Sequence, residues 1–305
     1  MSQTDLKRDK NMSQTQPVIG FIGLGLMGSA MVSCLQNNGF QLVVMANRSR
    51  VAVDAACARG ATEVNTPKDV AAQSDIIMLC MDTSESVEGR MRGENGIIAG
   101  VSAGKIVIDF GTSLPASTRQ LAQEVAAKDA QMLDAPLGRT PQHAKDGLLN
   151  IMAAGDKDAF DKAKAVLDVV GENVFYLGGS GAGHVMKLLN NAMSMTGASM
   201  MAEIYAVADK AGVSRQDVYD VMSSGPNHSG MMDMVSAYAL EDDATKLAFA
   251  IKNGSKDIGY YQQMLTDSGI DNTIAKGAIE EMSAAIEAGM GDEMVAKMID
   301  HFKAR

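Results

Sequence analysis

The sequence has no tryptophan, and only 4% of its 305 residues are aromatic. Its 24 methionines are an unusual number, and flexible thioether side chains fill irregular gaps well. We therefore expect helices in the second half of the chain to pack on one another through methionine. The methionines expected in these contacts are Met186, Met193, Met195, Met200 and Met201.

Cysteine is scarce as well. Cys34, Cys57 and Cys80 lie in apolar segments, and neither they nor the four histidines have the spacing of a metal site or a catalytic triad. We expect thiols that fill the core of a protein in a reducing compartment, and no bound metal.

Positive charge is in deficit, with 27 basic against 37 acidic residues and a net charge of −10. This balance argues against binding to nucleic acid or to an anionic membrane, so an anionic ligand must be held by helix N-termini and single basic side chains. The apolar runs have the length of strands, far below a membrane span, and no signal-peptide core follows the start. These features predict a cytosolic protein.

Residues 1–16 are polar, show no apolar periodicity and contain the sequence Met-Ser-Gln-Thr twice, from Met1 and from Met12. We expect a disordered tail here, with residues 1–11 belonging to an alternative start or an added segment.

From Pro17 onward, short apolar strands alternate with helical segments, which is typical of a doubly wound, mostly parallel sheet. After residue 178 the pattern is helical throughout. We predict an α/β fold with a Rossmann-type domain over residues 17–178 and an all-helical domain over residues 179–305, joined by a long helix. The expected strands are 18–22, 41–45, 62–64, 76–80, 106–109, 132–135, 149–153 and 173–176, and the helices after the long one are 214–223, 247–266, 272–288 and 292–302.

The first strand and the first helix flank the sequence Gly23-Leu24-Gly25-Leu26-Met27-Gly28. In this context Gly23 permits a tight turn, Gly25 lets the backbone approach a pyrophosphate, and Gly28 lets helix and strand pack closely. The N-terminus of the helix then faces the phosphates. We expect a dinucleotide site rather than a glycine-rich turn without a ligand.

The second strand ends in Asn47-Arg48-Ser49, which offers no carboxylate to the ribose hydroxyls of NAD. These three side chains suit a 2′-phosphate, so NADP(H) is the expected cofactor and NAD(H) the alternative. If Arg48 only stacks on the adenine, the sequence predicts no clear preference between NADP(H) and NAD(H).

The sequence Gly138-Arg139-Thr140-Pro141 follows a predicted strand. Thr140 is expected as a helix N-cap and Pro141 as the first helical residue, which leaves free N–H groups beside the Arg139 guanidinium. Together these donors would bind a carboxylate or a sulfonate. The alternative is an exposed capping turn with a solvated arginine.

Lys187, Asn190, Asn191 and Ser194 stand at i, i+3, i+4 and i+7 of the predicted long helix and so share one stripe. The other faces are apolar, which favours a buried helix over a surface helix with a solvated Lys–Asn face. Burial lowers the pKa of a lysine, so Lys187 is a candidate proton donor or acceptor, oriented by Asn191. His184, one turn earlier, is expected to be a bystander.

Five stretches share an order along the chain: residues 23–28, 109–115, 134–140, the helix 183–191 with Lys187 and Asn191, and Lys256-Asp257. In these stretches the chain resembles the β-hydroxyacid dehydrogenases. The resemblance implies that Lys187 is the catalytic acid/base and that Asn191 positions it and the substrate. It also implies a homodimer or homotetramer and places four further residues on the cofactor, namely Met81, Asp82, Thr112 and Lys256.

Two departures from the family pattern concern the substrate. Gly138-Arg139-Thr140 replaces the usual Ser-Gly-Gly and is similar to the sulfolactaldehyde reductases, and Gly111 replaces a serine whose hydrogen bond is then lost. We expect NADPH-dependent reduction of a short acid semialdehyde, with 3-sulfolactaldehyde first and the methylmalonate (3-hydroxyisobutyrate), tartronate and succinate semialdehydes as alternatives. An imine reductase and a non-catalytic NADPH-binding regulator are further alternatives, which the intact lysine disfavours. The acid group would be held by Gly138, Arg139, Thr140, Asn190, Asn191 and Ser194.

Overall fold

The computed structural model describes residues 16–47 and 50–305. Residues 1–15 of the expected tail lie outside the described residues, as do Arg48 and Ser49. The chain divides into two compact units, of which the first ends at His184 and the second begins at Val185. The sequence-based prediction sets the boundary at residue 178.

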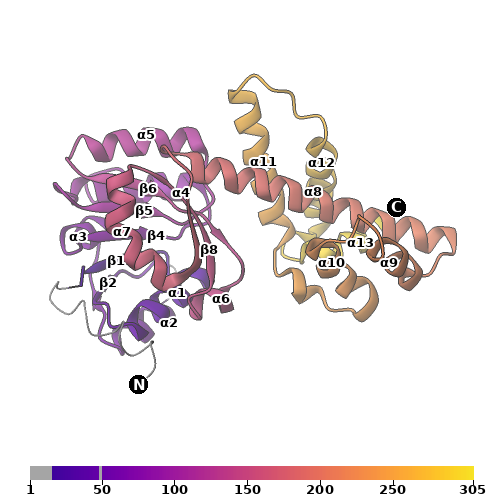
Figure 1. Cartoon of the computed structure of the whole chain (residues 1–305), viewed down its shortest axis with the longest axis horizontal. Coiled ribbons are helices and arrows are strands. Elements are labelled where there is room, and N and C mark those ends of the chain that lie inside the picture. The colour runs from indigo at the N-terminus through magenta and orange to yellow at the C-terminus, as the bar shows by residue number, and fades with distance from the viewer. Residues whose placement is uncertain (1–15, 48–49) are drawn as a thin grey trace. The chain divides into compact units, whose positions relative to one another are not determined.

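The first unit is built on a central sheet in which strands β1 to β6 are parallel (Figure 1). Their order, β3-β2-β1-β4-β5-β6, winds outward in both directions from β1 and confirms the predicted doubly wound fold. β8 pairs antiparallel with β6 and β7, and parallel with β9. The strands are β1 Ile19–Ile22, β2 Leu42–Val44, β3 Thr62–Glu63, β4 Ile76–Leu79, β5 Ile106–Asp109, β6 Gln131–Asp134, β7 Leu137–Gly138, β8 Leu149–Gly155 and β9 Gly171–Tyr176.

Two apolar layers cover the sheet because successive strand residues point to opposite faces. In β5, Ile106 and Ile108 belong to one layer and Val107 to the other. Helices α1, α2, α6 and α7 contribute to the first layer, and α3, α4 and α5 to the second. The helices are α1 Leu26–Asn37, α2 Val51–Cys57, α3 Pro67–Ala72, α4 Ser84–Met91, α5 Pro115–Ala126, α6 Pro141–Lys145, α7 Lys157–Val170 and the 3-10 turn η2 Ile97–Ala99.

The second unit is helical, as predicted. Its core includes Met195 and Tyr205 of the long helix α8, together with Ile258 and Met282. The predicted N-cap Ser214 is confirmed, since its Oγ accepts a hydrogen bond from the N–H of Asp217 at 3.0 Å. The prediction missed α10. The helices are α8 Ala182–Ala211, α9 Arg215–Ser223, α10 Gly230–Glu241, α11 Ile251–Asp267, α12 Ala275–Ala285 and α13 Met298–Lys303, with short turns η3 Ala244–Leu247, η4 Ile286–Met290 and η5 Val295–Lys297.

The methionines of α8 divide between two sides of the helix. Met195 is 4% exposed and Met201 packs against the core, as expected. The expectation is wrong for Met186, Met193 and Met200, which are 42%, 80% and 57% exposed. These three recur every seven residues and therefore share the side of α8 that does not contact the core of its unit. Across the described residues, no helix combines the length and apolarity needed to cross a bilayer.

Candidate functional site

A cavity of about 390 Å³ lies at the carboxyl ends of β1, β2 and β4. β1 and β4 are the neighbouring strands from which the chain winds in opposite directions, and open α/β sheets bind ligands at such a switch point. The lining residues come from the segments that follow the three strands and from α4. They are Gly23, Leu24, Gly25, Met45, Asn47, Val53, Cys80, Met81, Asp82, Ser86, Gly89 and Arg90.

Six of the residues predicted to hold the dinucleotide line this cavity, namely Gly23, Leu24, Gly25, Asn47, Met81 and Asp82. Leu26, Met27 and Gly28 form the first turn of α1 instead, and Thr112 is a half-buried residue of the loop after β5. The prediction missed Ser86, Gly89 and Arg90 of α4. Their i, i+3, i+4 spacing, directly after the N-cap Thr83, was the available signal, since it places all three on one helix face.

The glycine-rich loop has the geometry that a pyrophosphate requires. Gly23 has φ +96°, and a Cβ on it would lie 2.2 Å from the carbonyl oxygen of Cys80. A Cβ on Gly28 would lie 2.0 Å from the carbonyl oxygen of Gly23, so the predicted steric roles of both glycines are confirmed. A Cβ on Gly25, the N-cap of α1, would meet no protein atom within 4 Å. The open space at Gly25 fits a bound phosphate at a helix N-terminus.

Substitutions at Gly25 and Gly28 are expected to separate binding from folding. Gly25→Ala adds a methyl group where no protein atom lies, so the unfolding midpoint stays close to that of the parent while dinucleotide affinity falls about tenfold or more. Gly28→Ala forces a Cβ against backbone and lowers stability itself. Isothermal titration with the dinucleotide and thermal unfolding test both variants. Unchanged affinity in Gly25→Ala would contradict backbone approach at this residue.

The three cysteines are free thiols. Cys34 is buried, as expected, whereas Cys80 lines the cavity. Burial, with smaller contributions from Asp109 and Asp82, raises the pKa of the Cys80 thiol to about 12. The thiol is therefore protonated near neutral pH and is not a nucleophile.

Two aspartates end adjacent strands of the sheet. Asp109 of β5 and Asp134 of β6 are partners in register and are 1% and 0% exposed. Asp109 accepts hydrogen bonds from the N–H of Gly111 and from Oγ of Ser113, both at 2.8 Å. These bonds fix the loop that carries Thr112, which the resemblance places on the cofactor.

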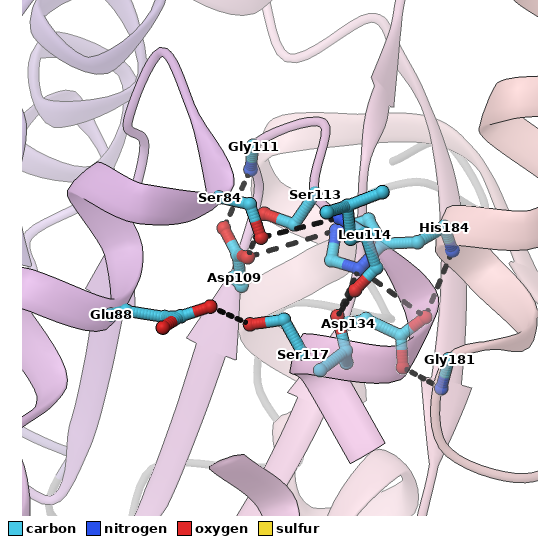
Figure 2. Close-up of polar contacts among 11 residues, drawn as sticks. Ser84, Glu88, Asp109, Gly111, Ser113, Leu114, Ser117, Asp134, Gly181 and His184 are labelled. Atoms are coloured by element: carbon cyan, nitrogen blue, oxygen red, sulfur yellow. Dashed lines mark hydrogen bonds and ion pairs between the residues drawn. The ribbon is translucent and has the colours of Figure 1, made fainter. Parts of the chain in front are cut away.

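His184 lies between these two carboxylates (Figure 2). Its side chain is fully buried, with Nδ1 at 2.8 Å from Oγ1 of Thr118 and Nε2 at 3.7 Å from Oδ2 of Asp109. That His184 is a bystander to the chemistry stays a prediction, but the sequence did not indicate that its side chain belongs to a buried polar cluster of the first unit. A single sequence does not reveal such a cluster, since its members are brought together only by the sheet.

Asp134 caps the start of α8. Its two carboxylate oxygens accept hydrogen bonds from the N–H of Gly181 at 2.8 Å and of His184 at 2.9 Å. The backbone lies so close here that a Cβ on Gly183 would be 2.2 Å from the carbonyl oxygen of Met152. The first turn of α8 is thus held by β6 and β8.

The predicted substrate loop is ordered by its own hydrogen bonds. Thr140 and Pro141 are the N-cap and first residue of α6, as predicted, although Oγ1 of Thr140 lies 2.7 Å from Nδ1 of His143 instead of capping an N–H. Arg139 has φ +78°, and its Nη1 donates to the Leu148 carbonyl at 2.6 Å and to Oε2 of Glu172 at 2.5 Å. Among the described residues, its hydrogen bonds use Nη1 alone, so Nε and Nη2 still have N–H groups to donate.

The second unit contains the predicted catalytic residues. Asn191 is 6% exposed, and its Nδ2 donates to Oδ2 of buried Asp257 at 2.6 Å. Nζ of Lys256 lies 3.0 Å from Oδ1 of the same carboxylate. Removal from water lowers the pKa of Lys187, Asp257 opposes this change and Lys256 adds to it. A lysine of lowered pKa beside an oriented amide can exchange a proton with a substrate.

The remainder of the predicted polar stripe is more open than expected. Lys187 and Ser194 are half-buried, while Asn190 is exposed and donates from Nδ2 to Oδ1 of Asn191 at 3.3 Å. Leu189 and Met193 are 45% and 80% exposed, so the prediction of a helix buried on its apolar faces is wrong. The apolar positions surround α8, but its own unit covers only one side of it.

Comparison with known families covers nearly the whole chain. Residues 18–178 match the family model described as the NAD binding domain of 6-phosphogluconate dehydrogenase. Residues 181–302 match the model described as NAD-binding of NADP-dependent 3-hydroxyisobutyrate dehydrogenase.

Individual proteins agree with these matches. The chain is 30% identical to glyoxylate/succinic semialdehyde reductase 2 of Arabidopsis thaliana, over 94% of this chain and 79% of the relative. It has the fold of the 3-hydroxyisobutyrate dehydrogenase of Mycobacterium tuberculosis, with a TM-score of 0.85 and 22% identity over 95% of this chain and all of the other. An imine reductase of Myxococcus stipitatus in complex with NADP⁺ is less similar, with a TM-score of 0.60 and 19% identity over 94% of this chain and 99% of the other.

The predicted enzyme class is confirmed at the level of the family: an oxidoreductase that acts on CH–OH groups with a nicotinamide dinucleotide. The glycine-rich loop and the cavity beside it fit that cofactor, of which NADP(H) and NAD(H) are the two forms. The chain belongs to the NAD(P)-dependent β-hydroxyacid dehydrogenases, the family of 3-hydroxyisobutyrate dehydrogenase.

Proposed function

We propose that this protein uses NADPH to reduce a short anionic semialdehyde to its hydroxy acid. The observation that carries the proposal is the Lys187 amine, whose pKa is lowered by removal from water, on the same helix as an Asn191 held by Asp257. An amine whose pKa is lowered gives up its proton more readily than the amine of a fully solvated lysine.

Reduction of an aldehyde needs one hydride and one proton. When bound, the reduced nicotinamide supplies the hydride to the carbonyl carbon. Lys187, as the ammonium, gives its proton to the carbonyl oxygen, and the product is an alcohol. Asn191 orients the amine and the substrate, and its bond to Asp257 keeps the Asn191 amide from rotating. In the reverse direction the neutral Lys187 amine accepts the hydroxyl proton.

Arg139 and the N-terminus of α6 are the proposed receptor for the acid group. The N–H groups of Arg139 on Nε and Nη2 can bind two oxygens of a sulfonate or a carboxylate. We keep 3-sulfolactaldehyde as the first candidate substrate. Succinate semialdehyde is the second, supported by the Arabidopsis relative named above. Assembly into a homo-oligomer and a cytosolic location stay predictions.

A panel of semialdehydes tests the proposal. NADPH oxidation is followed with 3-sulfolactaldehyde and with the succinate, methylmalonate and tartronate semialdehydes, in the parent and in Arg139→Gly. We expect turnover by the parent and a loss of about tenfold or more in kcat/KM in the variant, largest for the sulfonated substrate. Lys145→Ala, which removes an exposed cation of the same helix α6, is the control and should keep the parent's values.

Three outcomes count against the proposal. If Arg139→Gly matches the parent with every substrate, Arg139 is not the acid receptor. If the parent reduces a cyclic imine but no semialdehyde, the protein is an imine reductase. If it binds NADPH and turns over nothing, a regulatory role replaces the enzymatic one.

A further inference from the structure

Helix α4 presents one of its faces to the cofactor cavity. Its other side is fixed to the neighbouring elements: Oγ of Ser84 accepts from the N–H of Leu114 at 3.3 Å, and Oε1 of Glu88 accepts from Oγ of Ser117 at 2.6 Å (Figure 2). Arg92, directly after the helix, bonds to Glu88 and to a glutamate of α5. With this side occupied, the opposite face points into the cavity.

The residues of this opposite face are Ser86, Gly89 and Arg90, all of which line the cavity. Gly89 has no side chain, and a Cβ there would meet no protein atom within 4 Å, so the space beside Arg90 is open. Arg90 is therefore placed to contact a ligand while α4 is held in position by its other side.

Arg90 is directed to the end of the β2 segment. Its Nη2 donates a hydrogen bond to Oδ1 of Asn47 at 2.8 Å. A guanidinium has five N–H groups, and the bond to Asn47 uses one of them among the described residues. Four N–H groups of Arg90 and the Nδ2 amide of Asn47 are thus donors toward a ligand as far as the described residues go. Among the described residues that line the cavity, Asp82 alone is acidic. The pair thus presents donors and positive charge where an NAD-specific site would present a carboxylate.

We propose that Arg90, together with Asn47, binds the 2′-phosphate of the adenosine ribose and so sets a preference for NADPH over NADH. The inference rests on the proposed use of NADPH and assigns a specificity-determining residue to that site. A 2′-phosphate is a pure acceptor with close to two negative charges, and a guanidinium binds two of its oxygens at once. A free 2′-hydroxyl offers this pair much less, since it is neutral and is itself a donor. The sequence-based assignment gave the phosphate to Asn47, Arg48 and Ser49, without Arg90.

Nucleotide fragments without nicotinamide test this inference apart from the reaction. Dissociation constants of 2′,5′-ADP and 5′-ADP are measured by isothermal titration with the full chain, and those of NADPH and NADH by fluorescence. We expect Arg90→Ala to raise the dissociation constants of 2′,5′-ADP and NADPH about tenfold or more. Those of 5′-ADP and NADH should stay within about twofold of the parent's. Arg90→Lys keeps the positive charge but cannot bind two phosphate oxygens in the bidentate manner of a guanidinium. Its affinity for 2′,5′-ADP should therefore lie between those of the parent and of Arg90→Ala. The charge control is Arg119→Ala, on an exposed position of α5 outside the cavity.

The outcomes separate cleanly. If Arg90→Ala weakens the binding of 2′,5′-ADP and of 5′-ADP equally, the inference is overturned, because the arginine then only shapes the pocket. The same holds if Arg90→Ala changes neither constant while Arg48→Ala abolishes the preference. Thermal unfolding shows whether each variant is folded. If Arg90→Ala is unfolded, the dissociation constants of Arg90→Lys test the inference instead. If the parent protein binds 2′,5′-ADP more tightly than 5′-ADP but reduces no aldehyde, the proposed function is contradicted and this inference is not.

Discussion

Replacing Lys187 by alanine is expected to lower kcat for aldehyde reduction about 100- to 10,000-fold, the range for loss of a general acid. Partial removal from water lowers the pKa of the half-buried Lys187 ammonium, so its proton passes more readily to an oxygen that becomes negative as hydride arrives. NADPH affinity should stay within about twofold, because the nucleotide cavity is lined by residues of the first unit. Stopped-flow kinetics and fluorescence titration give the two quantities.

Two matched variants identify the cause of the loss. Lys187→Arg keeps a positive charge that does not release its proton near neutral pH, so it should be nearly as slow as Lys187→Ala. Lys210→Ala removes an exposed lysine near the other end of α8 and should behave as the parent. Near-parental kcat in Lys187→Arg would mean that Lys187 supplies charge rather than a proton.

Replacing Asp134 by alanine is expected to destabilise the protein by about 3 kcal/mol or more, the sum for two backbone donors that lose a charged, buried acceptor. Gly181 and His184 are buried, and among the described residues the hydrogen bonds of their N–H groups go to the Asp134 carboxylate. The first turn of α8 should then fray. Urea denaturation followed by circular dichroism measures the change in the free energy of unfolding.

An exposed cap provides the comparison. Asp156 accepts from the N–H of Ala159 at the start of α7 but is exposed, so Asp156→Ala should cost about 1 kcal/mol. Asp134→Asn keeps one acceptor oxygen, so its loss in free energy of unfolding should lie between those of Asp134→Ala and Asp156→Ala. If Asp134→Ala cost no more than Asp156→Ala, the buried cap would not hold the start of α8.

Features set by local sequence were predicted well. The bounds of β1, β2, β4 and β5 lie within one residue of the expected strands, because each is an apolar run that ends at polar residues or glycine. The steric roles of Gly23 and Gly28 also follow from local sequence, since motif and flanking elements together define the turn.

Features that depend on contacts across the chain were not predicted. The contact of Arg90 with Asn47 joins residues 43 positions apart, and that of Asp134 with His184 joins residues 50 apart. Both arise from strand order, which periodicity does not encode. The exposure of Met193 was misjudged for a related reason: an apolar position on a helix shows that burial is favourable, not that a neighbouring helix covers it.

The pH dependence of kcat/KM in both directions tests the central claim most directly, namely that Lys187 exchanges the proton. Reduction needs the ammonium, so its rate should be highest at low pH and fall as pH rises through the lowered pKa of Lys187. Oxidation of the hydroxy acid needs the neutral amine, so its rate should rise through the same pKa. Both transitions should disappear in Lys187→Arg. If they persisted unchanged in that variant, another group would carry the proton and the account would be contradicted.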